Sequence, residues 1–275
     1  AAAAGAAASA KIMVAKHGNR AVTSSCGSAD VLEALNIPVS LSPSEGAAAL
    51  RTHRFAFFHA PALHPAMKAV MPVRRALGIR TIFHLVGPLS NPAGASAQVM
   101  GVYAPHLVPL AAEAMVLLNT RHAFVVHGET GTPKQNSSTG NAASTIGGTI
   151  GGTLGLDEFS ISGPSHFAEV RSGPGLSGTV TLGTITPEDV GLTRAPIETL
   201  QGGDARANAQ ILTAIFSGEK SPRRDIVLLN AAAVLVTADL APDLITGIAL
   251  AAEAIDSGAV NNLIAALRTE PIHSS

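Results

Sequence analysis

The chain has 275 residues and a formal charge of −1, from 18 basic and 19 acidic side chains. This balance, with only 3% aromatic residues, argues against nucleic-acid binding, which needs a basic surface and stacking rings. Apolar residues make up 47% and charged residues 13%, so we expect a well-buried core and exclude a disordered chain. Cys26 is the single cysteine and cannot close an intrachain disulfide, which fits a reducing compartment such as the cytoplasm.

Neither the N-terminus nor the longest apolar run carries a membrane or export signal. Residues 1–10 are rich in alanine but lack the basic start and bulky apolar middle of a signal peptide, so helix propensity explains them. The run 226–255 is interrupted by acidic residues and by Pro242, which predicts two packed helices and not a membrane span. There is no initiator methionine, and we expect the chain to be the remnant of a longer protein.

Strand-like apolar runs alternate with helical patterns through the first half of the chain, which is typical of an α/β sheet with helices on its faces. Ser42-Pro43-Ser44-Glu45 is a capping box with proline at the first helical position, and Gly78 stands where a C-terminal glycine belongs. The expected strands are 11–15, 55–58, 81–86, 97–103 and 123–126, and the expected helices are 28–35, 65–77, 106–118 and one starting at Pro43.

The second half adds strands at 167–170 and 180–182, then helices from near Thr186 and Asp204 to Leu267. No charged or proline-rich linker separates the halves, so we expect a single α/β domain over 1–275. Residues 129–153 are dominated by Gly, Ser, Thr and Asn, which predicts a low-complexity surface loop inserted into that domain.

Cations, amides, hydroxyls and glycines concentrate between Lys16 and Ser28. The stretches 16–20 (KHGNR) and 23–28 (TSSCGS) lie between the first expected strand and a helix for which Ser28 is the expected N-cap. A helix N-terminus offers N–H groups to an anion, and Lys16 and Arg20 add full positive charges. We interpret the segment as a phosphate-binding loop; a capped helix after a solvated loop is the alternative.

A second candidate segment follows the expected strand 55–58. Pro65 suits a first helical position, so His64 would lie at the mouth of a helix that also carries Arg74. The Arg74 guanidinium could bind the carboxylate of a small substrate in bidentate fashion. The alternative is that His64 caps the helix and that the arginines are solvated.

Two loop segments could line or complete a site. Gly87–Pro92 is dense in Gly, Pro, Ser and Asn, and reads equally as a rigid ligand-lining loop or as a tight turn. The adjacent carboxylates Asp157 and Glu158 follow a glycine and could bind Mg²⁺, although such a pair is also common on solvated surfaces. Asp204 reads best as a helix cap, and Cys26 is not expected to act as a catalytic thiol.

Taken in order, these motifs closely resemble those of the anthranilate phosphoribosyltransferases, over nearly all of the chain from Ala15 to about Leu267. Several separate motifs in one order are hard to produce by chance. They are KHGNRAVTSS at 16–25, HPAMK at 64–68 with RRALGIRT at 74–81, FHLVGPLSNPA at 83–93, GLDEFS at 155–160, EVR at 169–171, GGDARANA at 202–209 and GEKSPRRDIVLLNAA at 218–232.

The resemblance implies transfer of the phosphoribosyl group of 5-phosphoribosyl 1-pyrophosphate (PRPP) to anthranilate, with release of pyrophosphate, in tryptophan biosynthesis. It implies a mixed sheet flanked by helices, the large domain of the nucleoside phosphorylase/anthranilate phosphoribosyltransferase type, with most of the small N-terminal helical domain absent. Positioning and electrostatics would carry catalysis without a covalent nucleophile. A homodimer is implied for the full-length protein.

The resemblance also assigns site residues, position by position. Asp157 and Glu158 match the family's Mg²⁺ pair, so Mg²⁺ is the expected cofactor. The expected PRPP contacts are Lys16, Gly18, Asn19, Arg20, Ser24, Ser25 and Ser28, and the expected anthranilate contacts are His17, Asn19, His64 and Arg74.

The chain also departs from the family pattern. The family's glycine-rich phosphate loop and its Asn-x-Ser-Thr segment lie upstream of the first expected strand, so we expect this chain to turn over weakly or not at all. The stretch 129–153 interrupts the family's short connection between His127-Gly128 and Gly155. Two alternatives stay open, a non-catalytic binding protein of the same fold and a pyrimidine nucleoside phosphorylase; Asn19-Arg20 and Arg74-Arg75 match the anthranilate enzymes instead.

Overall fold

The computed structural model describes residues 6, 12–18, 20, 26–60, 82–131, 155–173 and 176–269. The chain divides into two compact units whose segments alternate along the sequence. Unit 1 comprises 1–95, 202–219 and 249–275, and unit 2 comprises 96–201 and 220–248. The expectation of a single domain with an insertion at 129–153 stays a prediction.

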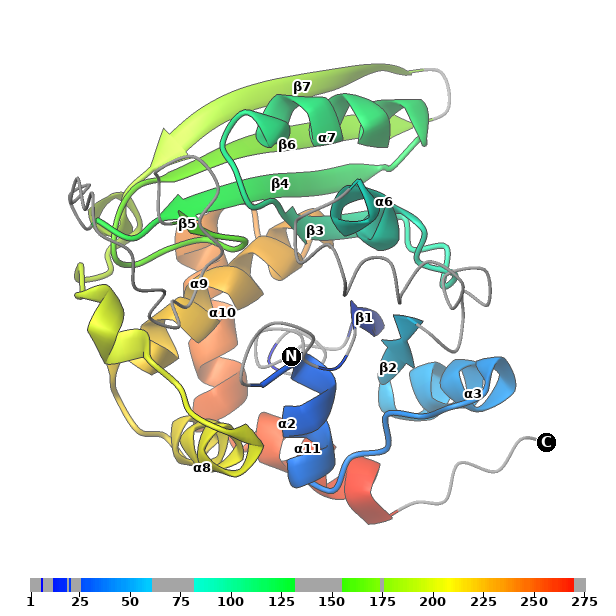
Figure 1. Cartoon of the computed structure of the whole chain (residues 1–275), viewed down its shortest axis with the longest axis vertical. Helices are drawn as coiled ribbons and strands as arrows, with labels where there is room; N and C mark the ends of the chain where they lie inside the picture. Colours follow the sequence, from blue (N-terminus) through cyan, green and yellow to red (C-terminus); the bar gives the residue numbers. More distant parts are fainter. Residues whose placement is uncertain are drawn as a thin grey trace, which may run out of the picture. The chain divides into compact units, whose positions relative to one another are not determined.

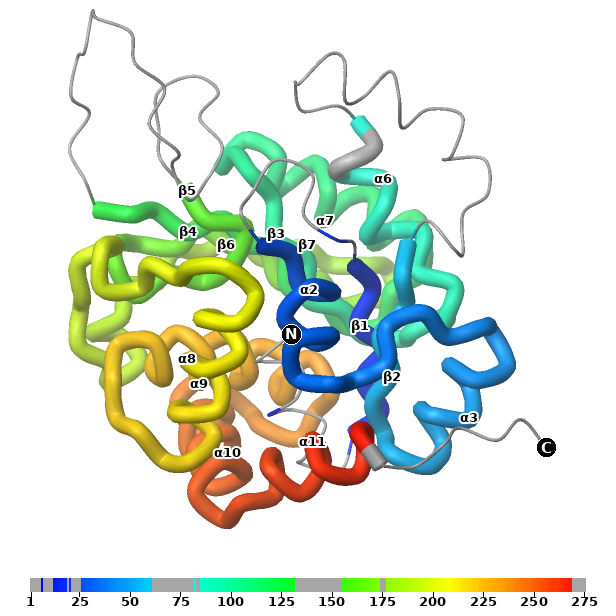
Figure 2. Tube along the Cα trace, turned by 60° about the horizontal axis from the view of Figure 1, so that its bottom comes forward, coloured from blue at the N-terminus to red at the C-terminus, as the bar shows by residue number. Residues whose placement is uncertain are grey.

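Unit 1 contains a two-stranded parallel sheet. Strand β1 (Val14–Gly18) pairs with β2 (Phe55–His59) in a register that sets Gly18 beside His59, and the two strands lie side by side in Figure 2. Helix α2 packs against α8, and α3 packs against β2 and α11. Among the described residues, the helices that lie wholly in this unit are α2 (Ser28–Ala34), α3 (Pro43–His53), α6 (Phe83–Leu89), α8 (Ala205–Phe216) and α11 (Ala259–Thr269).

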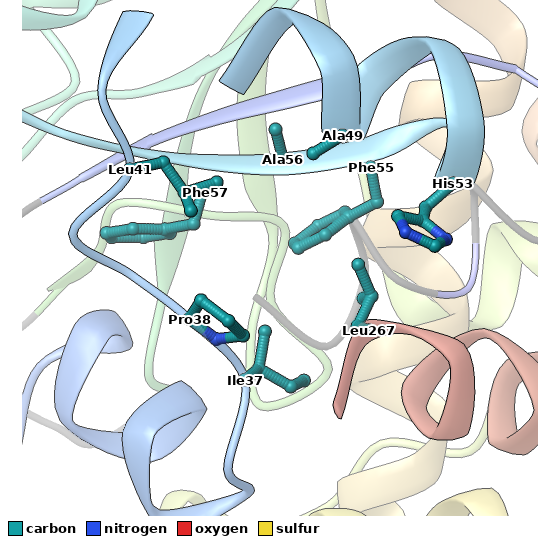
Figure 3. Close-up of a pocket in the computed structure, with 9 residues that line it drawn as sticks. All are labelled: Ile37, Pro38, Leu41, Ala49, His53, Phe55, Ala56, Phe57 and Leu267. Carbon is teal, nitrogen blue, oxygen red and sulfur yellow. The ribbon is translucent and has the colours of Figure 1, made fainter. Parts of the chain in front are cut away.

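The core of unit 1 forms on both sides of β2, because alternate side chains of a strand point to opposite faces. Phe55 and Phe57 point to one side, toward Ile37 and Leu267, and together line an apolar pocket (Figure 3). Phe58 packs on the other side against α3. The pocket of Figure 3 is therefore part of the core, and its described lining includes His53 but neither lysine nor arginine.

Unit 2 contains a mixed five-stranded sheet of order β3-β4-β6-β7, with β5 paired to β4. The β3–β4 pair is parallel and the remaining pairs are antiparallel, as expected for a mixed sheet. Helix α7 (Leu107–Leu117) packs on one face, and α9 (Pro222–Thr237) contacts β3 and β4 from the other side (Figure 1). The strands are β3 (Ala97–Gly101), β4 (His122–Glu129), β5 (Gly155–Leu156), β6 (Ser165–Gly173) and β7 (Leu176–Ile185).

Helix starts follow the predicted capping chemistry. The Ser42 hydroxyl accepts a hydrogen bond from the Glu45 N–H, and the Glu45 carboxylate accepts one from the Ser42 N–H. Asp204 accepts from the N–H of Ala207 and caps α8 as expected. The run 226–255 forms most of α9 and of α10 (Leu244–Asp256), with a turn at 238–243 between them. Two short 3₁₀ turns, Pro187–Val190 and Ile197–Leu200, precede α8. In the part of the chain that the structure describes, no helix is both long and apolar enough to span a membrane.

Several predicted boundaries are wrong. The predicted strand 81–86 is replaced by α6, which also takes in the first half of the predicted loop Gly87–Pro92, because so short an apolar run does not distinguish strand from helix. The first strand is shifted from 11–15 to Val14–Gly18, since pairing with apolar β2 outweighs the low strand propensity of Lys16 and His17. Glu129, the expected start of the inserted loop, is the last residue of β4.

Other predictions hold or lie outside the described residues. The strands predicted at 55–58, 97–103, 123–126, 167–170 and 180–182 and the helix predicted at 106–118 are confirmed, with ends that differ by a few residues. The predicted helix 65–77, its C-terminal Gly78 and residues 132–154 lie outside the described residues.

Candidate active site

In unit 1, two of the predicted motif segments leave the sheet at the same edge. β1 and β2 are parallel, so their carboxyl ends at Gly18 and His59 lie together. The first three residues of the KHGNR stretch, Lys16, His17 and Gly18, end β1, and His64 follows the end of β2 by five residues in sequence. The carboxyl edge of parallel strands is where α/β proteins usually bind ligands. The pairing of β1 with β2 thus sets the start of the expected PRPP-binding segment beside the end of the strand that precedes the expected anthranilate-binding segment.

Lys16, His17 and Gly18 are half-buried within β1 and not in a loop. The Lys16 ammonium donates a hydrogen bond to the His17 carbonyl oxygen, at 2.9 Å between Nζ and O. A Cβ at Gly18 would come within 3.1 Å of the Phe57 ring, so a larger residue would press on the core. The β1 and β2 backbones are therefore closely packed at this position.

The entry to α2 differs from the predicted anion site. Ser28 is the first residue of α2, and Gly27 takes the N-cap position. The Gly27 N–H donates to the Asp30 carboxylate at 2.8 Å, and α2 has only seven residues, so it offers an anion little partial positive charge. The Arg20 guanidinium forms an exposed ion pair with Glu33 of the same helix. A phosphate would have to compete with that pair.

His59 is a residue at this edge that the motif analysis missed. Its imidazole Nε2 is buried and has no hydrogen-bond partner in the structure, within the residues that it describes. Burial, and then the positive charge of Arg20, lower the pKa of His59, so the ring is neutral near pH 7. The only available signal was its position at the last residue of an apolar strand.

Five of the predicted site residues lie outside the described part of the chain: Asn19, Ser24, Ser25, His64 and Arg74.

In unit 2, the predicted acidic pair follows β5 directly. β5 pairs antiparallel with the end of β4, where Leu156 lies opposite Gly128. Leu156 and Phe159 are buried, whereas Asp157 and Glu158 between them are exposed. The loop is thus fixed at both ends by apolar side chains, and it presents two adjacent carboxylates to solvent.

Glycines on neighbouring strands leave just enough room for this acidic loop. A Cβ at Gly101, the last residue of β3, would lie 1.5 Å from the Asp157 carbonyl oxygen. A Cβ at Gly128 would lie 2.5 Å from the Glu158 carbonyl oxygen. Any side chain at these positions would displace the backbone that carries the carboxylates.

His127 lies below the start of the loop and is 1% exposed. Its Nδ1 lies 2.9 Å from the Val102 carbonyl oxygen, which can only accept, so Nδ1 carries the proton. Its Nε2 then bears a lone pair and faces Gly155, where a Cβ would come within 2.4 Å of that nitrogen. Burial lowers the pKa of His127, which keeps the ring neutral, and a flat neutral ring lets β5 pack closely on β4.

The acidic pair suits a magnesium ion held jointly with phosphates. Mg²⁺ is usually bound through one or two carboxylates together with substrate phosphates and water, rather than by an all-protein cage. Over the residues that the structure describes, no group of three or more His, Cys, Asp or Glu side chains could hold a metal. The exposed carboxylates of Asp157 and Glu158 match a site in which one or two carboxylates and the substrate phosphates share the ion.

The comparisons with known proteins place this fold in a family. The family model described as "Glycosyl transferase family, a/b domain" matches residues 1–149 and 147–261. The chain therefore belongs to the glycosyl transferases that have this α/β domain. Within them it belongs to the anthranilate phosphoribosyltransferase family, as predicted: it is 47% identical over 253 residues to the enzyme of Chloroflexus aggregans and 46% identical over 261 residues to that of Symbiobacterium thermophilum.

These matches cover 92% and 95% of this chain but 66% and 68% of the two relatives, so the chain spans about two thirds of their length. Among solved structures, the anthranilate phosphoribosyltransferase of Thermus thermophilus superposes with a TM-score of 0.80 at 38% identity, covering 97% of this chain and 71% of that one. The Saccharomyces cerevisiae enzyme, in complex with PRPP and Mg, shares the fold with a TM-score of 0.76 at 24% identity, over 96% of this chain and 67% of the yeast chain.

Proposed function

We propose that this chain is the α/β part of an enzyme that transfers the phosphoribosyl group of PRPP to anthranilate. The observation that carries the proposal is the sequence identity of about 46% to anthranilate phosphoribosyltransferases over more than nine tenths of the chain. The arrangement of unit 1 supports it, because the motifs expected to bind the two substrates start from one sheet edge.

On this proposal, the end of β1 and the residues after it bind PRPP. Lys16 and Arg20 neutralise phosphate charge, the Gly18 backbone lets the ligand approach, and Asn19 and the hydroxyls of Ser24, Ser25 and Ser28 donate hydrogen bonds. Anthranilate lies against His17, Asn19 and His64, and the Arg74 guanidinium binds its carboxylate as a bidentate partner. The Arg20–Glu33 ion pair opens when PRPP binds, since an exposed pair is worth at most about 1 kcal/mol.

Asp157 and Glu158 are proposed to hold Mg²⁺ with the pyrophosphate oxygens. When bound, the ion neutralises the negative charge of the departing pyrophosphate. The yeast relative in complex with PRPP and Mg has the same combination of ligand and ion.

In the reaction, the anthranilate amine nitrogen forms a bond to C1 of the ribose while the bond from C1 to pyrophosphate breaks. The amine loses one proton, and the products are N-(5-phosphoribosyl)anthranilate and pyrophosphate. Because the transition state has oxocarbenium character, the protein's part is to align the reactants and stabilise the leaving charge. No covalent nucleophile is required.

The test is a steady-state assay of anthranilate fluorescence with PRPP and Mg²⁺. It is run on this chain and on a longer protein that also includes any residues encoded directly upstream. We expect loss of anthranilate that requires both PRPP and the metal, together with stoichiometric pyrophosphate. The rate of the longer product decides the proposal. Absence of turnover there, or phosphorolysis of thymidine instead, would overturn it.

The proposal also includes a homodimer for the complete protein and a cytoplasmic location, where PRPP and anthranilate are both available. Sedimentation of the complete protein and fractionation of the source cells would test these two points.

A further inference from the structure

One side chain of α9 is bonded to both polar backbone groups of a single residue in the acidic loop. The Phe159 N–H donates to Oδ1 of Asn230 at 2.9 Å, and Nδ2 of Asn230 donates to the Phe159 carbonyl oxygen at 2.9 Å. The same Nδ2 lies 3.0 Å from the Ile226 carbonyl oxygen, which ties the amide to its own helix. Asn230 is 7% exposed, so these bonds form away from competing water.

Asn230 binds the N–H of the peptide group that joins Glu158 to Phe159. The Phe159 N–H and the Glu158 carbonyl are in one planar peptide unit, so fixing the N–H fixes the peptide plane next to the Glu158 Cα and restricts the backbone rotation ψ at Glu158. Gly128 lies against the same peptide on its carbonyl side, where a Cβ would approach the Glu158 oxygen to 2.5 Å. The plane is therefore constrained at both of its polar atoms.

The side chain of Phe159 is anchored independently of its backbone. Its ring is fully buried and packs edge-on against Phe124 at 5.8 Å between ring centroids. The next residue is held as well, because the Ser160 N–H donates to the Ser165 hydroxyl at 2.9 Å. The ring determines where the loop turns back into the core, while Asn230 determines how the preceding peptide is oriented.

We propose that Asn230 is a positioning residue for the metal-binding carboxylates, acting through the Phe159 backbone. The inference rests on the proposed role of Asp157 and Glu158 in binding Mg²⁺. Magnesium demands oxygen ligands near 2.0–2.1 Å in octahedral geometry, so a loop that carries its ligands needs a fixed backbone. A hydrogen-bonded partner behind a metal ligand typically contributes about 10–100-fold in metal affinity.

The experiment measures binding of Mn²⁺, a spectroscopic substitute for Mg²⁺, to the 275-residue chain in the presence of PRPP by electron paramagnetic resonance, because the ion is expected to be shared with phosphate oxygens. We expect Asn230→Ala to weaken Mn²⁺ binding by about 10-fold. The matched control is Ser172→Ala, which also removes a hydrogen bond from a largely buried side chain to a carbonyl oxygen in unit 2, that of Thr120 at 2.6 Å. Ser172 lies near the other end of β6, so its variant is expected to bind Mn²⁺ like the unmodified chain.

A further variant, Asp157→Asn, separates failure of this inference from failure of the proposed site. If Asp157→Asn leaves Mn²⁺ binding unchanged, the metal site itself is wrong. If Asp157→Asn weakens binding but folded Asn230→Ala does not, the site stands and the positioning role is overturned. Equal weakening by Ser172→Ala would also overturn it, because the effect would then reflect general destabilisation.

Asn230→Asp carries the test if Asn230→Ala does not fold. This variant keeps the volume and the acceptor for the Phe159 N–H, but it loses the donor and turns a carboxylate oxygen toward the carbonyl oxygens of Phe159 and Ile226. We expect weaker Mn²⁺ binding than in the unmodified chain, and faster amide exchange at Phe159 than in the unmodified chain. Affinity equal to that of the unmodified chain would contradict the proposal.

Discussion

The contact between Gly101 and Asp157 allows a substitution whose effect can be worked out from distances. In Gly101→Ala the new Cβ would lie 1.5 Å from the Asp157 carbonyl oxygen, 2.3 Å from its carbonyl carbon and 2.9 Å from its Cα. Ordinary van der Waals contact begins at 3.4 Å. The two backbones must therefore separate by about 2 Å, because the neighbouring atoms are main chain and cannot rotate away.

A shift of this size is large compared with the tolerance of a magnesium site. Metal–oxygen distances vary by only about 0.2 Å around their preferred values, so a loop displaced by about 2 Å no longer presents Asp157 and Glu158 as a pair. We expect Gly101→Ala to lower Mn²⁺ affinity by about 10–100-fold and to cost about 1–3 kcal/mol of stability from overpacking.

The assay combines Mn²⁺ titration with urea unfolding of the same protein. The control is Gly178→Ala in β7, whose Cβ would meet the end of the Val116 side chain at 2.4 Å instead of main chain. It should lose some stability and keep its Mn²⁺ affinity. A folded Gly101→Ala protein that binds Mn²⁺ within about twofold of the unmodified chain would refute the reasoning, since the loop would then tolerate the displacement.

Three further predictions follow from single contacts. Arg20→Ala should reduce PRPP affinity about 10-fold by calorimetry, because it removes a charge-assisted hydrogen bond. Its Tm should stay almost unchanged, because the Arg20–Glu33 ion pair is exposed. The control Arg194→Ala breaks another exposed ion pair and should change neither the PRPP affinity nor the Tm. Asp204→Ala should lose about 1 kcal/mol in urea unfolding by removing the cap of α8, whereas Asp204→Asn should retain most of it. His127 has a lowered pKa in the folded state, so the unfolded chain binds the proton more readily and the free energy of unfolding should fall as pH drops below about 6.5. In His127→Gln, urea unfolding between about pH 5 and 7 should show a smaller pH dependence of that free energy. An unchanged pH dependence would contradict the assignment.

Local chemistry predicted the elements that carry their own signals. The Ser42 capping box and the Asp204 cap were found in sequence because both ends of each hydrogen bond lie within four residues. Strand β2 was predicted because three of its first four residues are phenylalanine, which favours strands. The segment 81–86 failed because a short apolar run satisfies both a buried strand and a buried helix.

The sequence by itself determined the family and the chemical class of the candidate site, since the order of the motifs and the adjacent carboxylates Asp157 and Glu158 can be read without coordinates. It could not indicate what holds that pair. Gly101, Gly128 and Asn230 are separated from it by 29 to 72 residues in sequence (128 to 157 and 158 to 230), and only the folding of β3, β4 and α9 brings them against one loop. The physical reason is that the type of a residue already indicates what its side chain can bind. The close contacts that orient the side chain arise only when segments distant in sequence pack together.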